Sequence, residues 1–194
     1  MIKNKLIKGT VFTIGASLWW GIIGVLYFNF VSFASPLELT IHRTIWTALL
    51  LVITTSYYSK WSQFTKIIKS KINILILFIT GLLVSINWFT WLYAVSTNNL
   101  LDSALGYYIF PIFSVFFGII FLKENYNRNK IISVILVILA LIYFLIKLGE
   151  IPWIGITVAL TFSLYGLIRK KVQVSSDIGL LVETLLLTPI AIVL

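Results

Sequence analysis

The sequence predicts an all-α membrane protein, a polytopic bundle of spanning helices. Of its 194 residues, 60% are hydrophobic and only 11% are charged, and the mean hydropathy of +1.04 exceeds that of an ordinary soluble domain. The apolar residues form runs of roughly 16 to 24, each long enough to cross a hydrocarbon core of about 30 Å as a helix. Short polar segments separate these runs, and most of the basic residues lie in them.

Seven apolar runs follow one another, and we predict a span in each. The first run follows three lysines, so a signal peptide with a weak cleavage site at 32–34 is an alternative, but the run exceeds the usual apolar region of about 7 to 15 residues. The next five runs are bounded by polar or basic segments at both ends. The last run ends at Leu194 without a polar flank, so we expect a truncated chain. The predicted spans are 9–30, 36–58, 72–95, 100–122, 130–146, 151–168 and 178–194.

Basic residues alternate between the segments that separate the spans. Thirteen of the fifteen lie before the first span or in every second loop, whereas the opposite loops contain only Lys147. Because cytoplasmic loops carry the excess of Lys and Arg, we expect a cytoplasmic N-terminus in a bacterial inner membrane. A missed or extra span would put basic loops on both sides, so the pattern supports this division. The thirteen are Lys3, Lys5, Lys8, Lys60, Lys66, Lys69, Lys71, Lys123, Arg128, Lys130, Arg169, Lys170 and Lys171.

Composition excludes several classes of function. The chain has no cysteine, one histidine and six acidic residues, which excludes thiolate chemistry and leaves little material for a metal site. The net charge of +9 arises in the short loops, where topology signals lie, so we expect no nucleic-acid partner. No Walker-type glycine loop is present, and we expect no cofactor. The expected partners are a small-molecule substrate and membrane lipid.

The beginning of the chain is echoed near its end. Residues 162–166 (FSLYG) resemble 16–21 (ASLWWG), and 35–42 align with 176–183. Five spans lie between the starts of the two copies, and this odd number means that the second copy enters the membrane from the opposite side. We therefore predict an inverted repeat, as in many secondary transporters.

The repeat divides the chain into two units. Residues 1–147 form the first five-helix unit, and 151–194 begin the second. A repeat of five would reach ten spans with about three more helices after Leu194.

Polar side chains within the spans are the candidate substrate-binding residues, because an ionisable group in hydrocarbon costs at least about 2.5 to 3.5 kcal/mol. Counting about 1.5 Å per residue places most of them at one depth in the outer half of the membrane. Glu183 lies nearer the cytoplasm, and His42 or Arg43 is its candidate partner. Alternatively, Glu38 pairs with one of these two residues and only fixes helix packing. The candidates are His42, Arg43, Asn87, Trp91, Tyr107, Tyr108 and Glu183.

Proline and glycine residues are expected to shape the helices. Pro111 cannot donate a hydrogen bond to the carbonyl of Tyr107, which leaves that carbonyl for a ligand, a water or a neighbouring side chain, or else the proline merely kinks the helix. Gly106 permits a close approach in the same turn. We interpret Gly21 and Gly24 as positions where helices pack closely.

Four segments resemble the EamA branch of the drug/metabolite transporter superfamily. They are 39–46 (LTIHRTIW), 87–95 (NWFTWLYAV), 103–111 (SALGYYIFP) and 165–171 (YGLIRKK), and the similarity extends from Lys8 to Pro189. The resemblance implies a ten-helix permease of the bacterial plasma membrane, made of two five-helix EamA units. If the remaining helices are absent from the protein, transport would require a homodimer. The resemblance implies no particular substrate and no catalytic residues.

The leading hypothesis is a secondary transporter of small organic metabolites or drugs that works by alternating access between the repeats. Arg43 would bind a carboxylate or another anion, while the tyrosines and Trp91 would stack on or hydrogen-bond the rest. His42 facing Glu183 would suit proton-coupled exchange. One alternative is a non-transporting assembly or sensor subunit. A membrane-embedded enzyme is not expected, because the sequence lacks a nucleophile with an adjacent base.

Overall fold

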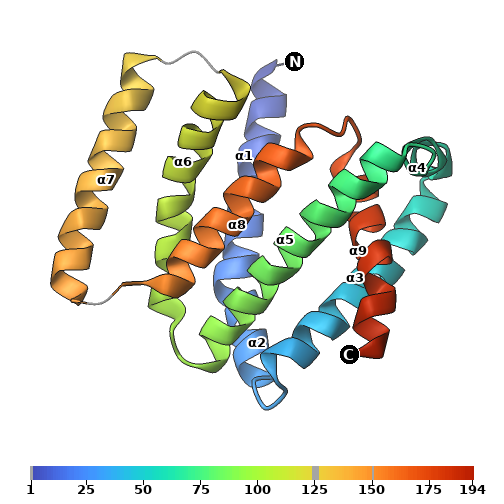
Figure 1. The fold of residues 1–194 in the computed structure, drawn as a ribbon, viewed down its shortest axis with the longest axis horizontal. Coiled ribbons are helices and arrows are strands. Elements are labelled where there is room, and N and C mark those ends of the chain that lie inside the picture. The colour runs from blue at the N-terminus through green and yellow to red at the C-terminus, as the bar shows by residue number, and fades with distance from the viewer. Residues whose placement is uncertain (1, 124–126, 150) are drawn as a thin grey trace.

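The computed structural model describes residues 2–123, 127–149 and 151–194, and the regular elements in these ranges are all helical (Figure 1). The predicted all-α bundle is therefore confirmed. In chain order the elements are α1 (Ile2–Leu18), the π-helical segment η1 (Trp19–Gly24), α2 (Val25–Phe30), α3 (Pro36–Tyr57), α4 (Trp61–Ile68), α5 (Lys71–Ser96), α6 (Leu100–Leu122), α7 (Arg128–Leu148), α8 (Trp153–Arg169) and α9 (Ser176–Val193).

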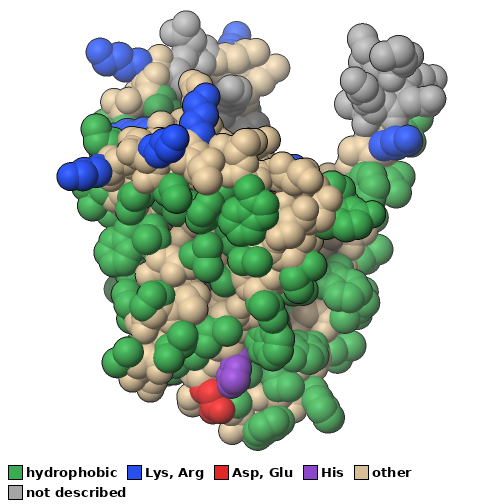
Figure 2. Space-filling view, turned by 90° about the vertical axis from the view of Figure 1, so that its right-hand side faces the viewer, with side chains coloured by type: hydrophobic (Ala, Val, Ile, Leu, Met, Phe, Trp, Pro, Cys, Tyr) green, Lys and Arg blue, Asp and Glu red, His purple; other side chains and the backbone are tan. Residues whose placement is uncertain are grey.

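Five helices in the described part of the chain are long and apolar enough to cross a membrane. They are Ile7–Phe30, Pro36–Tyr57, Lys71–Ser96, Leu100–Leu122 and Ser176–Val193, and each coincides with a predicted span. The predicted span 151–168 corresponds to α8, which is apolar but has only 17 residues. The predicted span 130–146 lies in α7, whose side chains are described only in part. Figure 2 shows apolar side chains covering the flank of the molecule, with Lys and Arg gathered along one rim.

Local signals in the sequence set where the long helices begin. Ser35 caps α3 by accepting a hydrogen bond from the Glu38 amide at 3.2 Å, and Pro36 occupies the first turn, where no amide hydrogen is needed. Ser70 caps α5 in the same way, accepting from the Asn73 amide at 3.4 Å. These caps fix the ends of the two helices that carry Arg43 and Asn87.

Two features of the first half depart from the sequence analysis. The basic segment between the second and third predicted spans is not only a loop, because it contains the short helix α4. Its Ile67 is buried in a cluster with Leu77 of α5 and Val182 of α9. The first span is not a uniform α-helix, since η1 inserts a π-helical segment between α1 and α2. Such segments are rare and are frequent at functional sites.

The core forms where α8 and α9 pack against the first half of the chain. α8 packs against α5 and α6, and α9 packs against α3 and α5. A Cβ at Gly106 of α6 would lie 2.8 Å from the Gly155 carbonyl of α8, so only glycine allows this approach, as predicted. α7 lies at one edge of the bundle and contacts α6 (Figure 1).

Candidate substrate cavity

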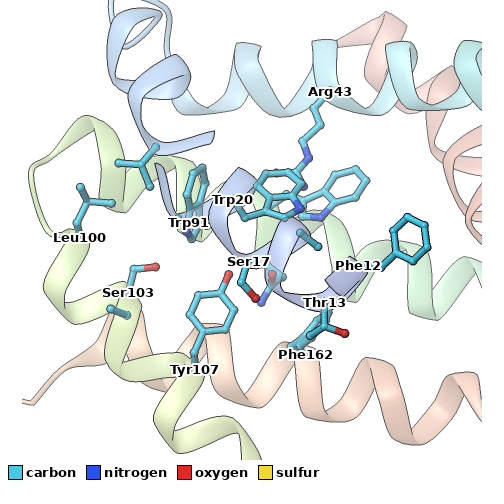
Figure 3. A pocket seen from close by; sticks show the side chains of 16 residues that line it. Phe12, Thr13, Ser17, Trp20, Arg43, Trp91, Leu100, Ser103, Tyr107 and Phe162 are labelled. Carbon is cyan, nitrogen blue, oxygen red and sulfur yellow. The ribbon is translucent and has the colours of Figure 1, made fainter. Parts of the chain in front are cut away.

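A cavity of about 1010 Å³ lies among α1, α3, α5, α6 and α8 (Figure 3). Most of its lining comes from the first span (α1, η1 and α2), the last turns of α5 and the first turns of α6. The α5 and α6 parts of the lining lie at the end of the bundle away from the basic rim (Figure 1). Apolar and aromatic side chains form most of the wall. The polar lining residues are Thr13, Ser17, Arg43, Asn87, Ser103 and Tyr107, and the aromatic ones include Phe12, Trp20, Trp88, Trp91 and Phe162.

Arg43 is the only charged side chain in the described lining of this cavity. Its guanidinium carbon lies 4.1 Å from the ring centroid of Trp88, 5.0 Å from that of Trp20 and 6.0 Å from that of Phe28. Figure 3 shows the side chain extending from α3 to the Trp20 ring. No ion pair or hydrogen bond holds the guanidinium among the described residues, so ring faces alone compensate its charge. Its five N–H donors are therefore free for a ligand.

The rings around Arg43 also contact one another. Trp91 of α5 meets Trp20 edge-on at 6.3 Å and Phe28 edge-on at 5.4 Å, measured between ring centroids. Edge-to-face contacts of this kind hold aromatic side chains in fixed orientations. Trp91, a predicted site residue, thus supports the aromatic wall and also lines the cavity.

The wall opposite Arg43 is formed by α6. Ser103 is 1% exposed, and its hydroxyl has no hydrogen-bond partner among the described residues. Figure 3 shows the hydroxyls of Ser103 and Tyr107 pointing into the cavity. A buried hydroxyl without a partner costs free energy, which a ligand or an ordered water would recover. Ser103 was not predicted, although it lies four residues before Tyr107 and thus on the same helix face.

Asn87 has a structural role as well as a place in the lining. Its amide nitrogen donates to the Val158 carbonyl at 3.0 Å and to the Thr161 hydroxyl at 3.1 Å, which ties α5 to α8. The amide oxygen accepts no hydrogen bond from the described residues.

Four of the predicted site residues, Arg43, Asn87, Trp91 and Tyr107, lie around one cavity.

Two predicted site residues lie elsewhere. His42 is exposed on the outer surface of α3, and Figure 2 shows the histidine on that surface beside an acidic side chain. Tyr108 is 67% exposed, and neither residue lines the cavity. His42 directly precedes Arg43, and Tyr108 directly follows Tyr107. A step of one residue turns a side chain by about 100° around a helix. The two side chains therefore point away from the cavity that the neighbouring residues line.

Glu183 is also outside the cavity and has a different partner from the one predicted. Its side chain is fully buried, and its carboxylate accepts from the Arg169 Nε at 3.2 Å, the Thr80 hydroxyl at 2.8 Å and the Tyr165 hydroxyl at 3.3 Å. The expected pairing with Arg43 or His42 is wrong. Arg169 had been interpreted only as a topology signal at the end of the sixth span.

The remaining positions divide between packing and lining. A Cβ at Gly21 would meet no atom within 4 Å, and Gly21 lines the cavity, so its interpretation as a close-packing position is wrong. Gly24 is buried, and its Cβ would lie 3.1 Å from the Trp20 ring of its own span. α6 continues as a helix through Pro111. Next to Pro111, the carbonyl of Phe110 accepts a hydrogen bond from the Ser163 hydroxyl at 3.2 Å.

Nothing in the described part of the chain resembles a metal site. No group of three or more His, Cys, Asp or Glu side chains lies close enough to hold an ion there. The cavity instead offers one cation, several hydroxyls and a set of aromatic faces. This combination can bind a small amphipathic molecule with an anionic group.

Comparison with known proteins identifies the family. Residues 7–146 match the EamA-like transporter family. The chain is 36% identical to the uncharacterized transporter YojE of Bacillus subtilis over 95% of its length and 63% of that protein, and 33% identical to Protein RarD of Escherichia coli over 95% and 62%. It thus spans less than two thirds of the length of these relatives. No solved structure matches it. The chain belongs to the EamA-like transporter family, as a RarD-type member within a group of membrane transporters.

Proposed function

We propose that the protein is a secondary transporter of small organic metabolites or drugs, and that the cavity is its substrate site. The observation that carries the proposal is the guanidinium of Arg43, which belongs to a helix long and apolar enough to span a membrane and lies on a cavity wall without an acidic partner among the described residues. An unpaired charge inside the membrane is costly and usually marks a substrate or ion path. The names of the relatives, which include uncharacterized transporters, agree with this function.

The chemistry of the walls suggests an anionic substrate with an apolar or aromatic body. Arg43 can hold a carboxylate through two parallel N–H···O bonds, and the hydroxyls of Ser103 and Tyr107 face it across the cavity. The volume of about 1010 Å³ lies at the upper end of the usual range for small-molecule sites, about 300 to 1,000 Å³. The tryptophan faces supply the apolar contacts.

The transport cycle that we propose is alternating access between the two halves of an inverted repeat in a bacterial inner membrane. The rim that carries the Lys and Arg side chains would face the cytoplasm, together with the N-terminus (Figure 2). The cavity would then represent the side of the path away from the cytoplasm. The proposal includes no catalytic step.

Binding of probes that differ only in charge tests the substrate class. The purified chain in lipid nanodiscs is titrated with phenylacetate, phenylacetamide and phenethylamine while tryptophan fluorescence is recorded, because Trp20, Trp88 and Trp91 line the cavity. We expect the anion to bind about 10 to 100 times more tightly than the amide, since a hydrogen bond to a charged group is worth about 1.5–3 kcal/mol. Arg43→Gln should remove this preference.

Arg128→Gln is the matched control, because it makes the same chemical change at an exposed arginine outside the cavity lining. It should leave the preference for the anion intact. Equal binding of the three probes, or an unchanged preference in Arg43→Gln, would contradict the proposed site. Uptake of the preferred probe by cells that express the gene, compared with the Arg43→Gln variant, then separates transport from binding alone.

A further inference from the structure

A second, smaller cleft lies at the C-terminal end of α8. It has a volume of about 330 Å³ and is lined by the last turn of α8 and the connection to α9, including Tyr165, Arg169 and Ser176. These residues are at the end of α8 that carries the basic rim, opposite to the end where α6 begins. The two spaces therefore lie toward opposite sides of the bundle along the same helix.

Two stacked rings on α8 stand between the two spaces. Phe162 lines the large cavity, and Tyr165 lines the smaller cleft. Their rings are parallel within 4°, with centroids 5.9 Å apart. Phe110 of α6 lies against the same partition, with its ring centroid 5.2 Å from that of Phe162. A solute moving from one space to the other along α8 would pass these rings.

The tyrosine of this pair is held by the buried Glu183. The Tyr165 hydroxyl donates to Glu183 Oε2 at 3.3 Å, while Thr80 of α5 and Arg169 bind the other oxygen. Arg169 in turn donates to the carbonyls of Val172 at 3.1 Å and Ser175 at 3.4 Å. The ring is thereby fixed to α5, to α9 and to the α8–α9 connection at once.

The approach of α5 to α9 at this level is close. A Cβ at Gly81 of α5 would lie 3.3 Å from the main-chain oxygen of Glu183. Packed interiors do not deform continuously, so α5 and α9 cannot move apart gradually at this level. This part of the bundle can therefore open without separating the helices only if side chains move. The Tyr165–Glu183 bond is the contact that such a movement must break.

We infer that Phe162 and Tyr165 form a closed gate between the two ends of one transport path, and that Glu183 and Arg169 hold this gate shut. The inference rests on the proposed transport function, because it takes the cavity as the substrate site. It adds that the smaller cleft is the other end of the path. Phe162 and Tyr165 are positioning residues that control passage.

Thiol labelling tests the gate without any need for a substrate. The chain has no cysteine, so Ser17→Cys introduces a single thiol on the wall of the large cavity. Its reaction with a membrane-impermeant maleimide is followed in right-side-out and inside-out vesicles. Thr97→Cys, directly after the last residue of α5, and Ser62→Cys, in α4 before the first residue of α5, identify the two sides independently of any assumed topology.

With the gate intact, the Ser17→Cys thiol should react from the side of the Thr97 reporter and be protected from the side of the Ser62 reporter. Adding Phe162→Ala should raise labelling from the Ser62 side by about tenfold, the change in population that about 1.4 kcal/mol produces. Tyr165→Phe, which keeps the ring and removes the hydrogen bond to Glu183, should raise it by a smaller factor. Labelling from the Thr97 side should not change.

Phe89→Ala is the matched control. Phe89 is also stacked on a tyrosine of its own helix, with 6.4 Å between the centroids, and it is 38% exposed compared with 36% for Phe162, but it lines neither space. It should leave labelling from the Ser62 side unchanged. An equal rise in Phe89→Ala, or no rise in Phe162→Ala, overturns the gate. If Phe162→Ala does not insert, Phe162→Leu is measured against the same criteria.

The outcomes separate the two proposals. In one outcome, Phe162→Ala raises labelling of the Ser17→Cys thiol from the Ser62 side, but none of the three probes binds the cavity. This outcome supports the gate as a structural partition and counts against the proposed substrate class. Charge-selective binding that depends on Arg43, together with unchanged labelling in Phe162→Ala, retains the site and overturns the gate.

Discussion

Arg43 and Arg169 lie in two different regions of the helix bundle, and they differ in what compensates their charge. Arg169 pairs with the buried Glu183 and donates to two main-chain carbonyls. Arg43 has only aromatic faces around it among the described residues. A satisfied charge stabilises a fold, whereas an unsatisfied one at a cavity is available to a ligand. The comparison therefore assigns the holding of helices and of the proposed gate to one region of the bundle and substrate binding to the other.

Removing Glu183, the partner of Arg169, should destabilise the protein strongly, whereas removing Arg43 should hardly change its stability. Glu183→Leu leaves the Arg169 guanidinium, 13% exposed, without its carboxylate, so the free energy of unfolding should fall by about 3–5 kcal/mol. Arg43→Leu orphans no acidic group and should change stability by less than about 1 kcal/mol. Unfolding in mixed detergent micelles, followed by circular dichroism, measures both. Equal losses in the two variants would refute the distinction.

The path of the Arg169 side chain offers a test without removing any charge. A Cβ at Gly179 would overlap the Arg169 guanidinium, so the side chain can follow its present path to Glu183 only because residue 179 is glycine. Gly179→Ala should displace the guanidinium and lower stability by about 1–3 kcal/mol, the usual cost of overpacking. Gly166→Ala is the matched control, since a Cβ there would meet no atom within 4 Å. Stability loss in the control but not in Gly179→Ala would contradict the proposed path.

These two regions also show what the sequence could and could not predict. Depth along a helix follows from a fixed rise per residue, so the sequence could group Arg43, Asn87 and Tyr107, and the structure places all three in the lining of one cavity. Direction around the helix was not predictable for His42 and Tyr108, because helices that are apolar on all faces carry no sign of which face is buried. The long apolar helices were recognisable from length and hydropathy alone, whereas the short helix α4 and the π-helical segment η1 were not.

The partner of Glu183 could not be found from spacing. Arg169 lies 14 positions away, beyond a turn, and its side chain bends back over Gly179 into the bundle. Nothing in a one-dimensional pattern distinguishes this arginine from neighbouring basic residues that act as topology signals. Ser103, by contrast, could have been predicted from the sequence. It lies four residues before Tyr107, and this spacing places it on the same face of the helix.

The smallest expected effect concerns this hydroxyl. Ser103 Oγ is buried without a partner among the described residues, so Ser103→Ala removes an unsatisfied group and should leave stability unchanged or raise it by up to about 1 kcal/mol. If the hydroxyl bonds a bound anion, the same variant should weaken phenylacetate binding several-fold, by the roughly 0.5–1.5 kcal/mol of one hydrogen bond. Thr55→Ala is the control, because Thr55 carries the other such buried hydroxyl and lies outside the cavity lining. Similar stability in both variants, with weaker binding only in Ser103→Ala, would place the ligand against α6. Weaker binding in neither would restrict anion recognition to Arg43 and the rings around it.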